Sequence, residues 1–100
     1  MGAIKENNYT PEELLFANLG RAFAHPARKR ILEILLRDEM KRNIDLSELL
    51  NLSQPSIKRH IGMLVSANLV QVDYYPHCYM ISLNQNGLNP MKSFIESILN

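Results

Sequence analysis

Cysteine is scarce in this sequence: the 100 residues include a single one, Cys78. One cysteine excludes an internal disulfide and any cysteine-cluster metal site within one chain. This usage is typical of a reducing compartment, so we expect a cytoplasmic protein. The sequence also lacks a charged-then-apolar leader, and no apolar run approaches the ~20 residues that span a bilayer. We therefore expect neither secretion nor a membrane partner.

Glycine and proline are sparse as well, with 4 and 5 residues, whereas hydrophobic residues make up 46% of the chain. This composition is typical of a globular domain. A chain of 100 residues has room for one compact core, which leaves little space for a deep catalytic cavity. No two carboxylates pair with a histidine or nucleophile in a recognisable order. We predict one domain over residues 1–100, with no catalytic residue, no cofactor and no enzyme activity.

A large excess of charge of one sign is also missing, because the net charge is only +1. Taken whole, this value argues against nucleic-acid binding, which usually requires a basic surface. The distribution along the chain differs, since nine basic residues stand against five acidic ones between Arg21 and Arg59. Positive charge is concentrated in the central third, either as a binding face or as solvated helix faces.

Two helices are expected in the first part of the chain. Thr10 and Pro11 suit the cap and the first position of one helix, and Pro26 suits the first position of the next. Leu15 and Leu19 share one face of the first helix at helical spacing.

A helix-turn-helix is expected over residues 45–67. The polar stretch from Asp38 to Ile44 predicts a connection, after which Asp45 is expected to cap a short helix over 46–51. A tight turn follows, and Ser53 is expected to cap a longer helix. A short helix, a tight turn and a longer helix make the helix-turn-helix arrangement.

The longer helix has two different faces. Ile57, Ile61 and Leu64 fall on one face, which predicts contact with the core. The opposite face holds Pro55, Arg59, Gly62 and Ser66, with Ser56 and Lys58 beside it.

The last third predicts a hairpin and a final helix. Two runs rich in Val, Ile and Tyr, 69–74 and 78–83, flank Tyr75-Pro76-His77 and predict a two-stranded wing over 69–84. Asn89-Pro90 begins a helix with a full apolar stripe. The predicted fold class is mainly α with a small β-hairpin: a winged helix-turn-helix of about five helices and a two-stranded wing.

Two segments resemble the ArsR family of winged helix regulators. His25-Pro26-Ala27-Arg28-Lys29-Arg30-Ile31-Leu32 is similar to a short motif of that family, and residues 45–61 resemble its helix-turn-helix core, including Leu52-Ser53-Gln54 and the pair Arg59-His60. The resemblance spans residues 19–84. It implies a sequence-specific DNA-binding transcriptional regulator, a homodimeric repressor whose first and last helices form the dimer interface.

The sequence departs from the family pattern at four places. Arg42-Asn43-Ile44 stands where many members carry a Cys-x-Cys pair, and the final helix lacks the family's His and carboxylate ligands, so we expect no metal site and no metal sensing. Gly62 stands where the family often has a Lys. The wing tip, residues 75–77, lacks the usual Arg or Lys.

We expect double-stranded DNA to contact the start and outer face of the longer helix, because base edges and phosphates require polar and basic partners. Arg59 is expected to donate to guanine or grip a phosphate. His60 is alternatively a packing histidine, and Arg28 is alternatively a partner of Glu33 or a helix-surface residue. The predicted DNA-binding residues are Ser53, Gln54, Pro55, Ser56, Lys58, Arg59, His60 and Arg28.

The terminal helices, within 1–24 and 88–100, carry more apolar surface than a small core covers, which predicts pairing across a two-fold axis. The predicted dimerisation residues are Leu15, Leu19, Met91, Phe94, Ile95, Ile98 and Leu99. Two rival hypotheses remain at this point: a winged helix that binds proteins and not DNA, and a redox sensor acting through Cys78. The operator, the regulated genes and any effector stay unassigned.

Overall fold

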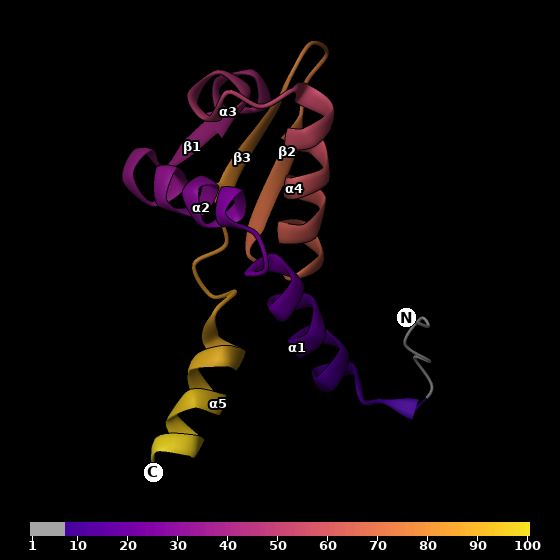
Figure 1. The fold of residues 1–100 in the computed structure, drawn as a ribbon, viewed down its shortest axis with the longest axis vertical. Coiled ribbons are helices and arrows are strands. Elements are labelled where there is room, and N and C mark those ends of the chain that lie inside the picture. Colours follow the sequence, from indigo (N-terminus) through magenta and orange to yellow (C-terminus); the bar gives the residue numbers. More distant parts are fainter. Residues whose placement is uncertain (1–7) are drawn as a thin grey trace.

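The computed structural model describes residues 8–100, so residues 1–7 of the predicted N-terminal segment lie outside the described part. The elements run in the order α1, α2, β1, α3, α4, β2, β3 and α5 (Figure 1). Their bounds are Pro11–Ala22, Pro26–Asp38, Met40–Arg42, Asn43–Leu50, Gln54–Ser66, Val70–Tyr74, Tyr79–Leu83 and Asn89–Leu99. The fold class is confirmed: five helices and a small antiparallel sheet.

Local capping determines where two of these helices begin. Thr10 and Glu13 form a reciprocal capping box at the start of α1, and the Ser53 hydroxyl accepts from the backbone nitrogen of Ser56 at the start of α4. Both caps were predicted. The backbone of Asn68, just after α4, has a φ of 60°, a left-handed conformation that commonly follows the end of a helix.

The sheet has three strands and not the two of the predicted wing. Its order is β1-β3-β2, and β1 pairs antiparallel with β3 so that Met40 lies opposite Ser82. The polar segment after α2 was predicted to be a connection. It becomes a strand because β2 occupies only one edge of β3, and the other edge offers unpaired backbone groups.

Helix α3 begins at Asn43, three residues before the predicted start. Asp45 is therefore not the cap residue but lies in the first turn, where its carboxylate accepts from the backbone nitrogen of Arg42 at 3.1 Å. The N–H group of Arg42 at the start of the helix thus has an acceptor in the first turn of that same helix.

The core lies where the helix-turn-helix meets the sheet. Its largest fully buried side chains come from α1, α2, α3, α4 and β3: Leu19, Ile31, Leu35, Leu46, Ile57, Leu64 and Ile81. Helix α4 contributes two of them, and it packs against α1, α2, α3 and β2. Its orientation is thus fixed from several sides.

Helices α1 and α5 extend from the body on the same side of the molecule (Figure 1). They meet through the rings of Phe16 and Phe94, whose centroids lie 4.7 Å apart in an edge-to-face arrangement. No residue of α5 is fully buried in the single chain. The apolar stripe of α5 is therefore left largely open.

Candidate nucleic-acid interface

The outer face of α4 presents the side chains that the sequence placed there. Gln54, Pro55, Lys58 and Arg59 are exposed, and Ser56 is half-buried. The Arg59 guanidinium donates to the Ser56 hydroxyl at 3.3 Å, one turn earlier on the same face. On the opposite side Ile57, Ile61 and Leu64 are buried, as predicted. The polar and basic groups of α4 therefore face solvent, while its apolar face stays packed against the core.

Two of the predicted DNA-binding residues, Arg28 and His60, are buried, and their side chains make contacts inside the chain. Their exposed fractions are 9% and 7%. Arg28 donates from Nε to the carbonyl of Ala22 at 3.1 Å and from Nη2 to the carbonyl of Arg21 at 2.8 Å. Its Nη1 lies 2.9 Å from Nδ1 of His60. A buried guanidinium needs such partners, so this pair belongs to the interior beneath α4.

The packing of His60 affects its protonation. Burial, followed by electrostatic repulsion from His25, Arg28 and Arg59, lowers the pKa of His60 below its ordinary value of 6.5. The ring of His25 lies beside it, with centroids 4.5 Å apart. His60 is thus a neutral, interior histidine at neutral pH.

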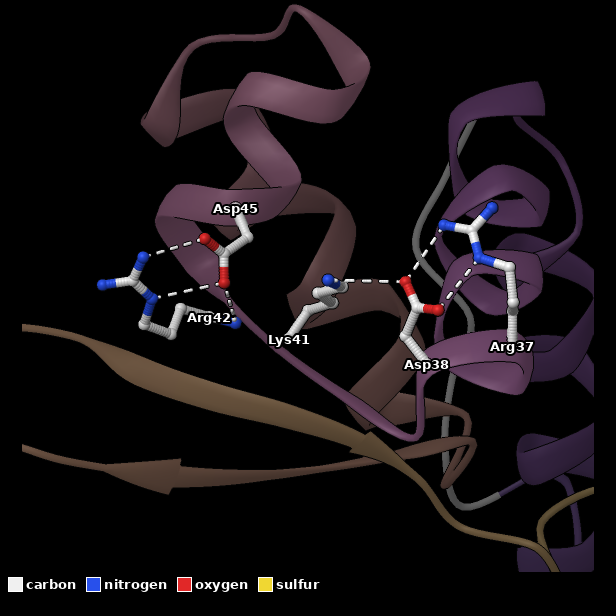
Figure 2. A network of polar contacts seen from close by, with 5 residues as sticks. All are labelled: Arg37, Asp38, Lys41, Arg42 and Asp45. Atoms are coloured by element: carbon white, nitrogen blue, oxygen red, sulfur yellow. Dashed lines mark hydrogen bonds and ion pairs between the residues drawn. The ribbon is translucent and has the colours of Figure 1, made fainter.

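Much of the positive charge in the central third is already paired. Figure 2 shows Asp38 between Arg37 and Lys41, and Asp45 beside Arg42. Hydrogen bonds from Arg37 and Arg42 hold the pKa of Asp38 and of Asp45, respectively, below the ordinary range. A further pair joins exposed Lys29 and Glu33.

Lys58 and Arg59 differ from these paired bases. Within residues 8–100 neither one forms an ion pair. Four of the nine central bases are thus engaged with carboxylates, while the two on α4 remain available to an external anion.

The wing lies beside the helix-turn-helix, and its tip is exposed. The backbone nitrogen of Tyr75 donates to the carbonyl of Cys78 at 2.9 Å and closes the turn. Tyr74 is largely exposed and packs its ring near that of Tyr79, with centroids 5.8 Å apart. Neither Tyr74 nor Tyr79 is among the predicted DNA-binding residues, although both lie at the end of the hairpin that was predicted to form the wing. Cys78 is only half-buried.

The predicted dimerisation residues divide into two groups. Phe94, Ile95, Ile98 and Leu99 are exposed, and Leu15 and Met91 are half-buried against the core. Leu19 is fully buried inside its own chain and is therefore not part of the exposed apolar surface. Its position on the inner face of α1 explains this, because that face covers α4.

Among residues 8–100 no group of three or more His, Cys, Asp or Glu side chains is placed to hold a metal ion. In the same part of the chain, no helix combines the length and apolar character needed to cross a bilayer.

This geometry defines a class of protein, the winged helix. Its members have a helix-turn-helix beside a small antiparallel sheet, and here the polar face of the second helix, α4, is exposed. Known proteins then identify the group within the class. Residues 25–72 match the sequence model described as bacterial regulatory protein, arsR family. The transcriptional repressor SdpR of Bacillus subtilis (strain 168) is 32% identical over 82 residues, covering 78% of this chain and 90% of that protein.

Solved structures agree on the fold. A crystal structure of an ArsR family transcriptional regulator superposes with a TM-score of 0.79 at 16% identity, covering 91% of each chain. HlyU from Vibrio cholerae N16961 superposes with a TM-score of 0.66 at 23% identity, covering 90% of this chain and 97% of its own. The chain belongs to the ArsR family of bacterial transcriptional regulators. The prediction of a regulator and not an enzyme is confirmed.

Proposed function

We propose that this chain is a cytoplasmic homodimer that binds a specific double-stranded DNA sequence through the outer face of α4 and represses transcription without a metal ion. One observation carries the DNA contact: Lys58 and Arg59 are exposed beside Gln54 and Ser56, and within residues 8–100 neither base has an ionic partner. Basic groups grip phosphates, and the polar groups read base edges.

The absence of metal sensing is supported by the contacts of Arg42 and Asn43, which stand where many members of the family carry the Cys-x-Cys pair. Arg42 pairs with Asp45 at 2.9 Å, and Oδ1 of Asn43 accepts from the backbone nitrogen of Tyr79 at 3.1 Å. Both side chains serve the structure, and neither is a usual transition-metal ligand. We expect removal of metals by a chelator to leave DNA binding unchanged.

Dimerisation and repression have separate support. The exposed stripe of α5 is an apolar surface that a two-fold partner would cover. The relative SdpR is described as a transcriptional repressor. A dimer also places two α4 helices on one duplex, as a two-fold operator requires.

Selection of bound duplexes from a random pool, followed by titration at two salt concentrations, tests the DNA contact. If Lys58 and Arg59 of both subunits contact phosphates, affinity falls by about a hundredfold between about 50 mM and 200 mM salt. No enriched sequence, or affinity that salt leaves unchanged, would instead support the rival hypothesis of a protein-binding winged helix.

A further inference from the structure

A single buried side chain joins three helices beneath the proposed DNA-binding face. Arg28 on α2 donates to the carbonyls of Arg21 and Ala22 at the end of α1, and its Nη1 lies 2.9 Å from Nδ1 of His60 on α4. His60 immediately follows Arg59, so the inner and outer contacts belong to the same turn of α4. The guanidinium therefore ties α4 to the corner between α1 and α2.

This contact requires one protonation state of His60. A guanidinium has only donors, so Nδ1 of His60 must accept, which places the proton of the neutral ring on Nε2. The neighbouring His25 has the same need, because its Nδ1 accepts from the backbone nitrogen of Ala27 at 3.0 Å as the cap of α2. Both rings use the nitrogen lone pair that protonation would remove.

We propose that Arg28 is a positioning residue for DNA binding, which holds α4 in its binding orientation through neutral His60 and releases it when His60 is protonated. The proposal rests on the proposed DNA contact by α4. Protonation would turn Nδ1 into a donor that faces a donor, and would bring two positive groups together in a nearly dry site. The end of α4 that carries Lys58 and Arg59 would then shift.

The charges around His60 act in one direction. Among the described residues, those acting on it are His25 at the start of α2, Arg28 within α2 and Arg59 on α4 itself. The other elements packed against α4, namely α1, α3 and β2, add no charge to this set. With burial, the three bases lower the pKa of His60, so the contact holds at neutral pH and is lost in acid as pH falls through that lowered pKa.

The main test is DNA affinity against pH at constant ionic strength, using a duplex selected at neutral pH. For the unchanged protein we expect at least about a tenfold loss between about pH 7.5 and a pH below the lowered pKa of His60, where the ring is protonated. His60→Asn keeps an acceptor oxygen near the position of Nδ1 and does not titrate. For this variant the ratio of the DNA affinity at neutral pH to that at acidic pH should therefore fall to near one. His77→Asn, on the exposed wing tip, is the matched control and should keep the full pH dependence.

A second variant separates position from charge. Arg28→Lys retains the charge, but its donors all sit on one nitrogen and cannot reach the three partners of Nε, Nη1 and Nη2, so we expect at least a tenfold loss of affinity at neutral pH. If this variant does not fold, NMR of the unchanged protein decides the matter. The ring nitrogens should show a proton on Nε2 of His60, and the backbone amides of Lys58 and Arg59 should shift with the titration of His60.

Those NMR measurements need no DNA, so they also separate this inference from the proposed function. If no duplex is bound but the amides of α4 follow His60, the DNA contact fails and the coupling stands. The coupling is overturned if His60→Asn keeps the pH dependence, if Nδ1 of His60 carries the proton, or if the amides of α4 do not respond.

Discussion

The side-chain oxygen of Asn43 accepts a hydrogen bond from the backbone nitrogen of Tyr79 at 3.1 Å, across 36 residues of sequence. Asn43 is the first residue of α3, and Tyr79 is the first residue of β3. Because Asn43 is buried, water does not replace this contact readily. One amide thus joins the start of the helix-turn-helix to the wing.

Replacing Asn43 by Ala should lower the free energy of unfolding by about 1 to 3 kcal/mol, because the Tyr79 donor loses its partner. Asn43→Asp keeps an acceptor oxygen and should cost less. Denaturant titration of both variants measures the difference. Equal stability of the Ala variant and the unchanged protein would show that the contact does not hold the wing.

Arg59→Ala should weaken DNA binding without affecting folding. Loss of a base or phosphate contact costs about 1 to 3 kcal/mol at each site, so a dimer should lose at least about tenfold in affinity. Ile61→Ala, on the buried face of the same helix, should instead lower stability by about 2 kcal/mol or more. Thermal melts and DNA titrations of both variants test this opposition. A stable Arg59→Ala protein with full affinity would contradict the assigned face.

Ile98→Glu should give monomers in sedimentation, because it places a charge on the exposed apolar stripe of α5. Ile98 is 64% exposed, so the change should leave the chain folded. Leu49→Glu on α3 is the matched control: Leu49 is 54% exposed and lies outside the proposed dimer interface. A dimer that survives the change at Ile98 would place the interface elsewhere.

Two glycine substitutions should change stability in opposite directions. A Cβ at Gly87 would lie 2.2 Å from the backbone oxygen of Asn68, so Gly87→Ala should cost about 1 to 3 kcal/mol. A Cβ at Gly62 on α4 meets nothing within 4 Å, so Gly62→Ala should stabilise the helix by about 0.5 to 1 kcal/mol. Thermal melts with the same sign for both would contradict this contrast.

The Asp45 carboxylate should make stability depend on pH in acid. Hydrogen bonds from Arg42 lower the pKa of Asp45 below its ordinary value of 3.8, so its contribution is present above that value and lost as pH falls through the lowered one. Asp45→Asn should therefore melt at a lower temperature near neutral pH. The difference should shrink between about pH 5 and about pH 3. A constant difference would mean that the charge of Asp45 does not matter.

Local signals predicted the helices well. The caps at Thr10 and Ser53 depend on residues three positions away, and the core face of α4 follows from helical spacing alone. The outer face of α4 could therefore be predicted as the complement of Ile57, Ile61 and Leu64.

Contacts between distant residues could not be predicted in the same way. The strand β1 exists because Met40 lies opposite Ser82, and its own sequence is short and polar. Arg28 and His60 were predicted to contact DNA, with packing as the alternative for His60 and a pair with Glu33 or a place on the helix surface as the alternatives for Arg28, yet each is the other's partner across 32 residues. The residues next to a basic side chain in the sequence do not show whether that side chain is buried against a distant partner.

The place of β3 at the centre of the sheet has a consequence for synthesis of the protein. β1 and the start of α3 emerge from the ribosome well before the strand that completes them, since Tyr79 follows Asn43 by 36 residues. A nascent chain that ends before β3 has no partner for the backbone groups of β1 or for the side chain of Asn43. The helix-turn-helix and the wing should thus fold together, at a rate set by closing this long loop. We expect chains truncated ahead of residue 79 to be early targets of proteases.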